Sequence, residues 1–277
     1  MPAEQLNDLS RCAVHTMTNK PWTLRQCVDA YARAGIGGIS VWRNVIEPIG
    51  AAEAGKLLRD NNLRVPALVR GGFFPATTAD ARSRAVDVNR ACIDEAREIG
   101  AEMVVLVCGA VPGMSLEDAR KQVTEGIAEI LPQARAANVK LAIEPLHPMY
   151  AADRSCVCRM TDARRICQQL RDPLVGIAAD VFHIWWDSDL QKEIKLAGEL
   201  GILFAFHVCD WRVQMRDMLN DRGLMGDGVI DLRTLRGWVE EAGFNGFNEV
   251  EVFSEEYWKM DQADYVTLIT ERYLKCV

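Results

Sequence analysis

The stretch of sequence that decides the fold is a short apolar run ending in a carboxylate, Leu141-Ala142-Ile143-Glu144-Pro145. The same pattern returns three times in the second half of the chain, where apolar runs meet Asp180, His207 and Glu251. Each run has the length and composition of a short buried strand. Each polar residue lies where such a strand would give way to a loop. Four polar side chains at equivalent strand ends indicate one shared site.

Strand-like and helix-like segments alternate along the whole chain of 277 residues. The strand-like runs lie near residues 11–16, 38–42, 64–69, 102–108, 139–144, 174–180, 202–207 and 246–253. Apolar residues with helical spacing occupy residues 22–34, 51–61, 79–99, 116–137, 161–170, 188–199, 231–242 and 255–274. This alternation predicts a parallel sheet with helical crossovers. Eight such pairs are typical of a (β/α)8 TIM barrel, so we expect an α/β fold with a single domain, residues 1–277.

A doubly wound sheet is the alternative fold for the same alternation. Such a sheet usually has fewer strands, and a glycine-rich first turn binds its dinucleotide. The corresponding turn in this chain, residues 15–20, contains no glycine. The sequence therefore favours the barrel.

The parity of the four strands supports a shared site. Alternate residues of a barrel strand point into the barrel and out toward the helices. If the four polar residues point inward, apolar neighbours such as Ile143, Phe204 and Phe206 point outward. Two glutamates, an aspartate and a histidine then converge, and they suit a divalent cation. Glu249 shares the inward face one layer deeper than Glu251.

Composition narrows the class of protein. The net charge of −7 argues against a non-specific nucleic-acid binder, which usually has a basic surface. No apolar run has the length of a membrane span. Residues 1–5 have neither the basic region nor the apolar core of a signal peptide. Nine cysteines without framework spacing predict reduced thiols in the cytoplasm.

The sequence resembles the sugar phosphate isomerase/epimerase superfamily of xylose-isomerase-like barrels. This superfamily includes ketose 3-epimerases, hydroxypyruvate isomerase, inosose dehydratase and, more distantly, endonuclease IV. The resemblance covers nearly the whole chain and rests on Ile143-Glu144-Pro145, on residues 180–183, 207–210 and 226–231, and on residues 249–253. It implies one divalent metal bound by Glu144, Asp180, His207 and Glu251. The metal is usually Mn2+, with Mg2+, Co2+ and Zn2+ as alternatives.

The resemblance also implies substrate contacts. Ketose epimerases have a histidine three residues after the ligand aspartate, and His183 occupies that position. They have an arginine six residues after the ligand histidine, where this chain has Val213, with Arg212 one position earlier. A glutamate expected six residues after Glu144 is replaced by Tyr150. We therefore expect His183 and Arg212 to bind substrate, and the substrate to differ from a plain free ketohexose.

Three further residues are candidates for substrate binding. His147 follows Glu144 on the same loop, and Trp186 follows a strand that carries a predicted ligand. Arg70 precedes two glycines at the end of the third strand, where it could hold a carboxylate or phosphate bidentately. Ordinary packing or bracing of loops is the alternative for all three.

Two metal-bound glutamates suit proton transfer next to a carbonyl. Glu144 and Glu251 can remove and return a proton through an enediolate. These residues predict a metal-dependent isomerase or epimerase of a sugar, sugar phosphate or keto-sugar. A metal-dependent lyase or dehydratase of a cyclic polyol or keto-sugar is the alternative. A zinc phosphodiesterase and a non-catalytic carbohydrate-binding barrel fit less well. We expect a small carbohydrate as partner, no nucleic acid and no membrane, with a homo-oligomer as an analogy from relatives.

Overall fold

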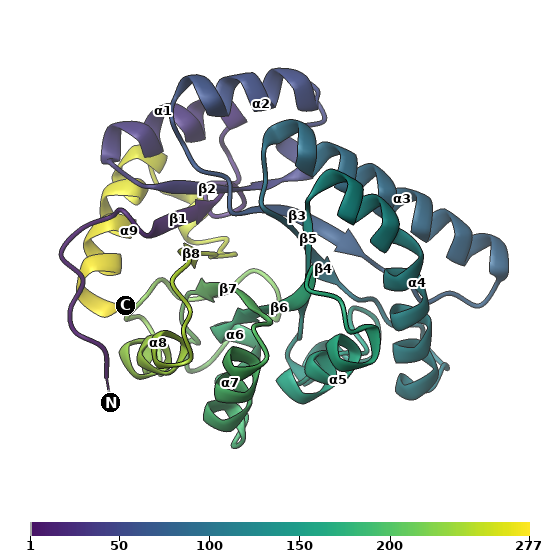
Figure 1. Ribbon diagram of the computed structural model, residues 1–277. Coiled ribbons are helices and arrows are strands. Elements are labelled where there is room, and N and C mark those ends of the chain that lie inside the picture. Colours follow the sequence, from purple (N-terminus) through teal and green to yellow (C-terminus); the bar gives the residue numbers. More distant parts are fainter. Residues whose placement is uncertain (1) are drawn as a thin grey trace.

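The computed structural model describes residues 2–277, which form a closed barrel of eight parallel strands (Figure 1). Each strand pairs with the next one along the chain, and β8 closes the ring on β1. The strands are β1 Cys12–His15, β2 Gly38–Trp42, β3 Ala67–Gly72, β4 Met103–Val107, β5 Lys140–Glu144, β6 Val175–Asp180, β7 Leu203–Val208 and β8 Asn248–Val250. The predicted (β/α)8 barrel is confirmed.

Helices surround the ring of strands (Figure 1). They are α1 Leu24–Ala34, α2 Ala51–Asp60, α3 Ala79–Ile99, α4 Leu116–Ala137, α5 Met160–Leu170, α6 Val181–Ile184, α7 Leu190–Glu199, α8 Leu232–Glu241 and α9 Gln262–Cys276. Several begin at side-chain caps that the sequence supplies. Thr23 and Gln26 form a capping box at α1, and Ser115 caps α4.

The core has two layers, as strand parity predicts. Small and medium side chains fill the barrel interior: Ala67, Val69, Met103, Val105, Ala142, Ala178 and Ala205. The residues between them, including Leu141, Ile143 and Phe206, pack outward against the helices. Phe204 differs from the expectation because it packs against the inner cluster. The β6–β7 pairing passes from Leu203 to Ala205, so Phe204 is the extra residue of a bulge, and its side chain changes face.

A second irregularity lies in β3, which we predicted at residues 64–69. Pro66 cannot donate to a ladder, and the strand begins at the next residue. The strand then continues through Gly71 and Gly72, which have little strand propensity by themselves. The pairing with β4 passes from Val69 to Gly71, so Arg70 is the extra residue of this bulge.

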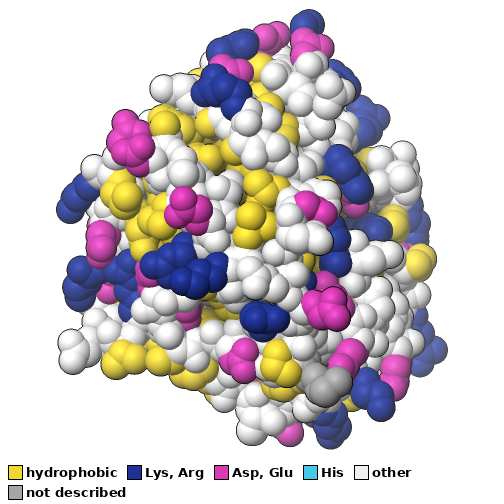
Figure 2. Space-filling model, turned by 90° about the vertical axis from the view of Figure 1, so that its left-hand side faces the viewer, with side chains coloured by type: hydrophobic (Ala, Val, Ile, Leu, Met, Phe, Trp, Pro, Cys, Tyr) yellow, Lys and Arg dark blue, Asp and Glu magenta, His cyan; other side chains and the backbone are white. Residues whose placement is uncertain are grey.

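The surface is mixed in charge. On the face in Figure 2, basic and acidic side chains are interspersed, and hydrophobic side chains gather between them. No helix within residues 2–277 is long and apolar enough to cross a membrane.

Candidate metal centre

Four predicted ligands meet at the carboxyl ends of neighbouring strands. Glu144 ends β5, Asp180 ends β6, His207 lies near the end of β7, and Glu251 directly follows β8. Each offers a ligand atom, and these atoms all lie within 4.8 Å of one another. All four side chains are buried. The barrel topology brings them together because parallel strands end at the same face.

The donor set fits a divalent cation. Oε1 of Glu144 and Nδ1 of His207 are buried and lack a hydrogen-bond partner, although they lie 3.1 Å apart. Burial raises the pKa of Asp180, and the neighbouring Glu251 and Glu144 raise it further. Burying three carboxylates side by side raises the free energy of the folded protein unless a cation or protons neutralise their charge. Hard oxygen donors with one imidazole suit Mn2+, Mg2+ or Zn2+.

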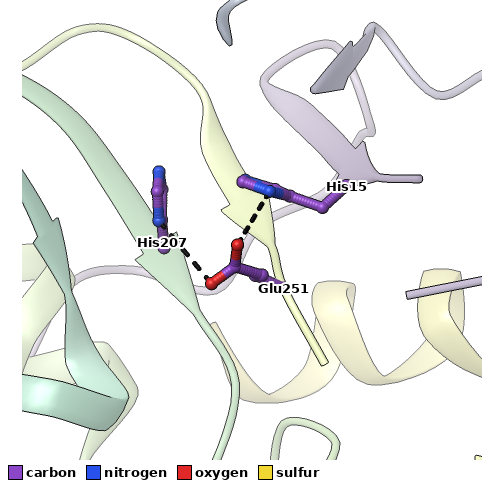
Figure 3. Close-up of side chains that lie close together, drawn as sticks. All are labelled: His15, His207 and Glu251. Atoms are coloured by element: carbon purple, nitrogen blue, oxygen red, sulfur yellow. Dashed lines mark ion pairs between the residues drawn. The ribbon is translucent and has the colours of Figure 1, made fainter. Parts of the chain in front are cut away.

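Glu251 lies between two imidazole rings (Figure 3). Its Oε1 is 3.0 Å from Nδ1 of His15, and its Oε2 is 3.9 Å from Nδ1 of His207. Burial disfavours a charged imidazole, yet Glu251 and Glu249 together raise the pKa of His15. His15 was not predicted as a site residue, although it ends the apolar run Cys12-Ala13-Val14 as Glu144, Asp180 and His207 end theirs.

A deeper carboxylate, that of Glu249, contacts the imidazole rings of His15 and His207. Oε2 of Glu249 accepts a hydrogen bond from Ser40 at 2.5 Å and lies 3.3 Å from Nε2 of His15. The same oxygen is 3.8 Å from Nε2 of His207. Burial would raise the pKa of Glu249, but His15 and His207 lower it. Glu249 thus faces the edge of His207 opposite to Nδ1, where a carboxylate can orient a metal-binding ring.

Arg222 reaches the centre from the loop after β7. Its Nη1 donates to Oδ2 of Asp180 and to Oε2 of Glu251, each at 2.9 Å. The guanidinium is buried between Phe182 and Phe253, with Cζ 4.5 and 4.8 Å from the two ring centres. Arg222 was not predicted from the sequence. The only available signal was its place beside the glycine-rich stretch 223–228 of the same loop.

His183 lies beside Arg222 and is held neutral. Its Nε2 is 3.3 Å from Nη2 of Arg222. Burial, followed by the charge of Arg222, holds the pKa of His183 well below its usual range. A guanidinium only donates, so this contact favours the tautomer in which Nε2 accepts and Nδ1 carries the proton; Nε2 also lies 3.5 Å from Oδ2 of Asp180. Nδ1 is buried without a partner, which leaves one N–H available to a ligand.

A cavity of about 330 Å³ opens above the centre. Its walls include Glu144, Glu251, His183 and Arg222, together with the predicted Arg70. Lys20 and Arg154, which were not predicted as site residues, also line it. This volume is at the small end of ligand sites and fits a small metabolite.

Three predicted substrate residues lie elsewhere. Arg212 is not among the residues that line the cavity; it pairs with Glu256 at 2.6 Å and with Asp227 at 3.2 Å. His147 and Trp186 lie against each other, with ring centres 5.7 Å apart, and also lie outside the cavity lining. Trp186 donates to the backbone carbonyl of His183, so it contacts the centre only indirectly.

Comparison with known proteins agrees with this architecture. Protein SMc04130 from Sinorhizobium meliloti 1021, a solved structure, is 47 % identical and superposes with a TM-score of 0.94 over 97 % of this chain and 99 % of its own. L-ribulose-5-phosphate 3-epimerase UlaE of Salmonella paratyphi C (strain RKS4594) is 24 % identical over 202 residues, 71 % of this chain and 67 % of the relative.

A third relative is the inosose isomerase of Bacillus velezensis (strain DSM 23117 / BGSC 10A6 / LMG 26770 / FZB42). It is 24 % identical over 224 residues, 79 % of this chain and 78 % of the relative. A sequence model described as xylose isomerase-like TIM barrel matches residues 28–269. The chain therefore belongs to the xylose isomerase-like TIM barrel family.

Proposed function

We propose that this protein is a divalent-metal-dependent isomerase or epimerase of a sugar, sugar phosphate or keto-sugar. The observation that carries the proposal is the meeting of Glu144, Asp180, His207 and Glu251 beneath a small cavity. Both glutamates belong to the cation site and also line that cavity. Relatives named as an epimerase and as an inosose isomerase support the reaction class.

The four residues would hold one divalent ion, for which we propose Mn2+. When bound, such an ion polarises a carbonyl and an adjacent hydroxyl and stabilises negative charge on their oxygens. The nine cysteines are unpaired, which is in keeping with our proposal of a cytoplasmic location.

The protein's own residues would supply the proton transfers. Glu144 on β5 and Glu251 after β8 approach the cavity from strands that are not neighbours in the ring. One carboxylate would remove the proton alpha to the carbonyl, and the other would return a proton. Return to the opposite face of the same carbon gives epimerisation, whereas return to the adjacent carbon gives isomerisation.

His183 and Arg222 would position the substrate. The N–H on Nδ1 of His183 can donate to a substrate oxygen, and Arg222 keeps that tautomer in place. Arg222 also bridges Asp180 and Glu251, which fixes the carboxylate of the proposed base. A fixed base costs less reorganisation during proton transfer.

The test is solvent exchange with the metal-loaded protein in heavy water. L-ribulose 5-phosphate and an inosose are the first substrates to try, because relatives bear names that contain them. We expect deuterium at the carbon alpha to the carbonyl and a product of otherwise unchanged mass. Loss of water from the substrate would favour the dehydratase alternative. Turnover without any exchange would contradict the two-glutamate mechanism.

A further inference from the structure

Three cationic side chains line the cavity without acidic partners. They are Lys20 after β1, Arg70 in β3 and Arg154 after β5. Within residues 2–277, no carboxylate lies within ion-pair distance of any of them. Arg222, which lines the same cavity, differs from them because it pairs with Asp180 and Glu251.

Aromatic rings brace these cations instead. Nζ of Lys20 lies 4.2 Å from the ring centre of Trp258. Cζ of Arg70 lies 4.5 Å from the ring centre of Phe73, and Cζ of Arg154 lies 5.7 Å from that of Tyr150. A ring attracts a cation through its quadrupole but does not neutralise it. The cavity wall therefore keeps its positive charge.

The charges of the metal centre do not cancel this excess. Glu144, Asp180 and Glu251 carry three negative charges, which a divalent cation and Arg222 would balance. The deeper Glu249 is matched by the imidazole of His15. Lys20, Arg70 and Arg154 then remain unbalanced.

The bulge in β3 directs Arg70 toward the cavity. As the extra residue of the β3 bulge, Arg70 lines the cavity, although regular alternation would give it the outward face of Leu68. Burial lowers the pKa of Arg70 and the charge of Arg154 lowers it further, against a smaller opposing effect of Glu144 and Glu251. Two like charges on one cavity wall repel each other until an anion lies between them.

We propose that the cavity binds an anionic substrate, whose phosphate or carboxylate group pairs with Arg70 and Arg154 while its carbonyl end faces the metal centre. Lys20 adds a further positive charge at the exposed edge. This inference rests on the proposed function and narrows its substrate class to sugar phosphates or sugar acids. A guanidinium can form two parallel hydrogen bonds with either a phosphate or a carboxylate. The two arginines therefore indicate an anionic substrate, and experiment must decide which of the two groups it carries.

Binding of small anions to the metal-loaded protein tests the inference. Calorimetric titration with inorganic phosphate is one arm, and titration with malonate is the other. Arg70→Gln and Arg154→Gln should each weaken binding of the preferred anion about tenfold or more, as expected for loss of a charge-assisted contact. Arg154→Lys keeps the charge and should restore part of the affinity.

Arg33→Gln is the matched control, because Arg33 is an exposed residue at the last turn of α1 and does not line the cavity. It removes the same charge and should leave anion binding unchanged. Tighter binding of phosphate supports a sugar phosphate, and tighter binding of malonate supports a sugar acid. Absence of binding, or cavity variants that behave like Arg33→Gln, would overturn the inference. If the anion binds only to the metal, the Arg70 and Arg154 variants will also behave like Arg33→Gln, and the inference fails.

The two proposals fail in different ways. If neutral keto-sugars exchange protons as well as their anionic counterparts and the arginine variants are silent, only the anion inference fails. A different pattern is that phosphate binds through Arg70 and Arg154, but no substrate undergoes exchange and no metal is retained. The proposed function then fails, and the anion site can no longer be assigned to the substrate of that reaction.

Discussion

Glu251 connects all parts of the centre. One of its oxygens faces His15 and the other faces both Arg222 and His207. Burial would raise the pKa of Glu251, but His15 and Arg222 hold it well below its usual range. The carboxylate is thus ionised and fixed, as a base for proton abstraction must be.

Replacing this base should stop turnover and spare part of the metal site. Glu251→Gln keeps an oxygen ligand but removes the basic carboxylate, so we expect a loss of kcat on the order of a hundredfold or more. Glu144→Gln should behave similarly. Glu255→Gln removes an exposed glutamate nearby and serves as the control. Full activity in both Glu251→Gln and Glu144→Gln would refute the assignment of these two glutamates as acid and base.

His183 should act on the substrate rather than on the metal. His183→Ala removes one neutral hydrogen-bond donor, and we expect kcat/KM to fall roughly tenfold with metal content unchanged. Elemental analysis beside steady-state kinetics measures both quantities. Loss of the metal in this variant would make His183 a ligand.

For single residues, the sequence predicts a place in the site where the alternation of a strand fixes whether the side chain points into the barrel. Glu144, Asp180, His207 and Glu251 lie at or next to strand ends, and the β7 bulge at Phe204 comes before His207, so their meeting could be expected from the sequence. Arg222 could not be expected, because its position depends on the path of the irregular loop between β7 and α8. Arg212 lies in the same loop but turns toward Asp227 and Glu256.

At the scale of elements, the β3 bulge links packing to the site. Asn89 of α3 accepts from the backbone N–H of Gly72 at 2.6 Å and donates to its carbonyl at 2.7 Å. A Cβ at Gly72, where φ is +106°, would lie 1.9 Å from the carbonyl oxygen of Val107. Only glycine allows this close approach of the two strands, and Asn89 satisfies the backbone groups that the bulge leaves free.

Removing this support should affect both stability and the cavity. Asn89→Ala leaves buried backbone groups of Gly72 without partners, which costs about 2–4 kcal/mol of unfolding free energy. Because Arg70 precedes the supported segment, phosphate binding should weaken as well. Urea denaturation and calorimetry measure the two effects. Wild-type stability in this variant would show that the bulge needs no side-chain support.

The helices α5 and α7 are joined by a pair of charges that depends on pH. Arg164 donates to Glu193 through Nε at 2.7 Å and Nη2 at 3.0 Å, and the Glu193 side chain is 5 % exposed. The hydrogen bonds from Arg164 lower the pKa of Glu193 below its ordinary value of 4.5. The resulting stabilisation is complete above pH 4.5 and is lost as the pH falls through the lowered pKa.

Glu193→Gln should therefore destabilise the protein by about 1–3 kcal/mol at neutral pH. The difference from wild type should shrink as the pH drops below the pKa of Glu193 in the folded protein, because the wild-type carboxyl then also loses its charge. Urea unfolding at a series of pH values measures this. A difference that stays constant down to pH 3 would contradict the role of the ion pair.

At the scale of the whole molecule, the alternation of segments was enough to predict the closed barrel. Most helix bounds followed apolar spacing and caps closely, but α9 begins at Gln262, seven residues later than predicted, and the short α6 was not predicted. Among the strands, β3 was displaced toward its glycines and β8 was shorter than its apolar run. Bulges at Arg70 and Phe204 altered parity locally, because register depends on pairing with the neighbouring strand and not on the strand's own pattern. The metal, the subunit number and the bounds of the domain stay predictions.

The central claim is that Glu144, Asp180, His207 and Glu251 bind one divalent ion. A crystal of the protein grown with Mn2+ and measured for anomalous scattering tests it most directly. We predict one strong peak per chain within about 2.0–2.6 Å of a ligand atom from each of the four residues. The peak should vanish in the double variant Asp180→Ala and His207→Ala, if the variant folds with an intact barrel. A wild-type crystal with no peak among these four side chains, or with the ion bound elsewhere, would contradict the account.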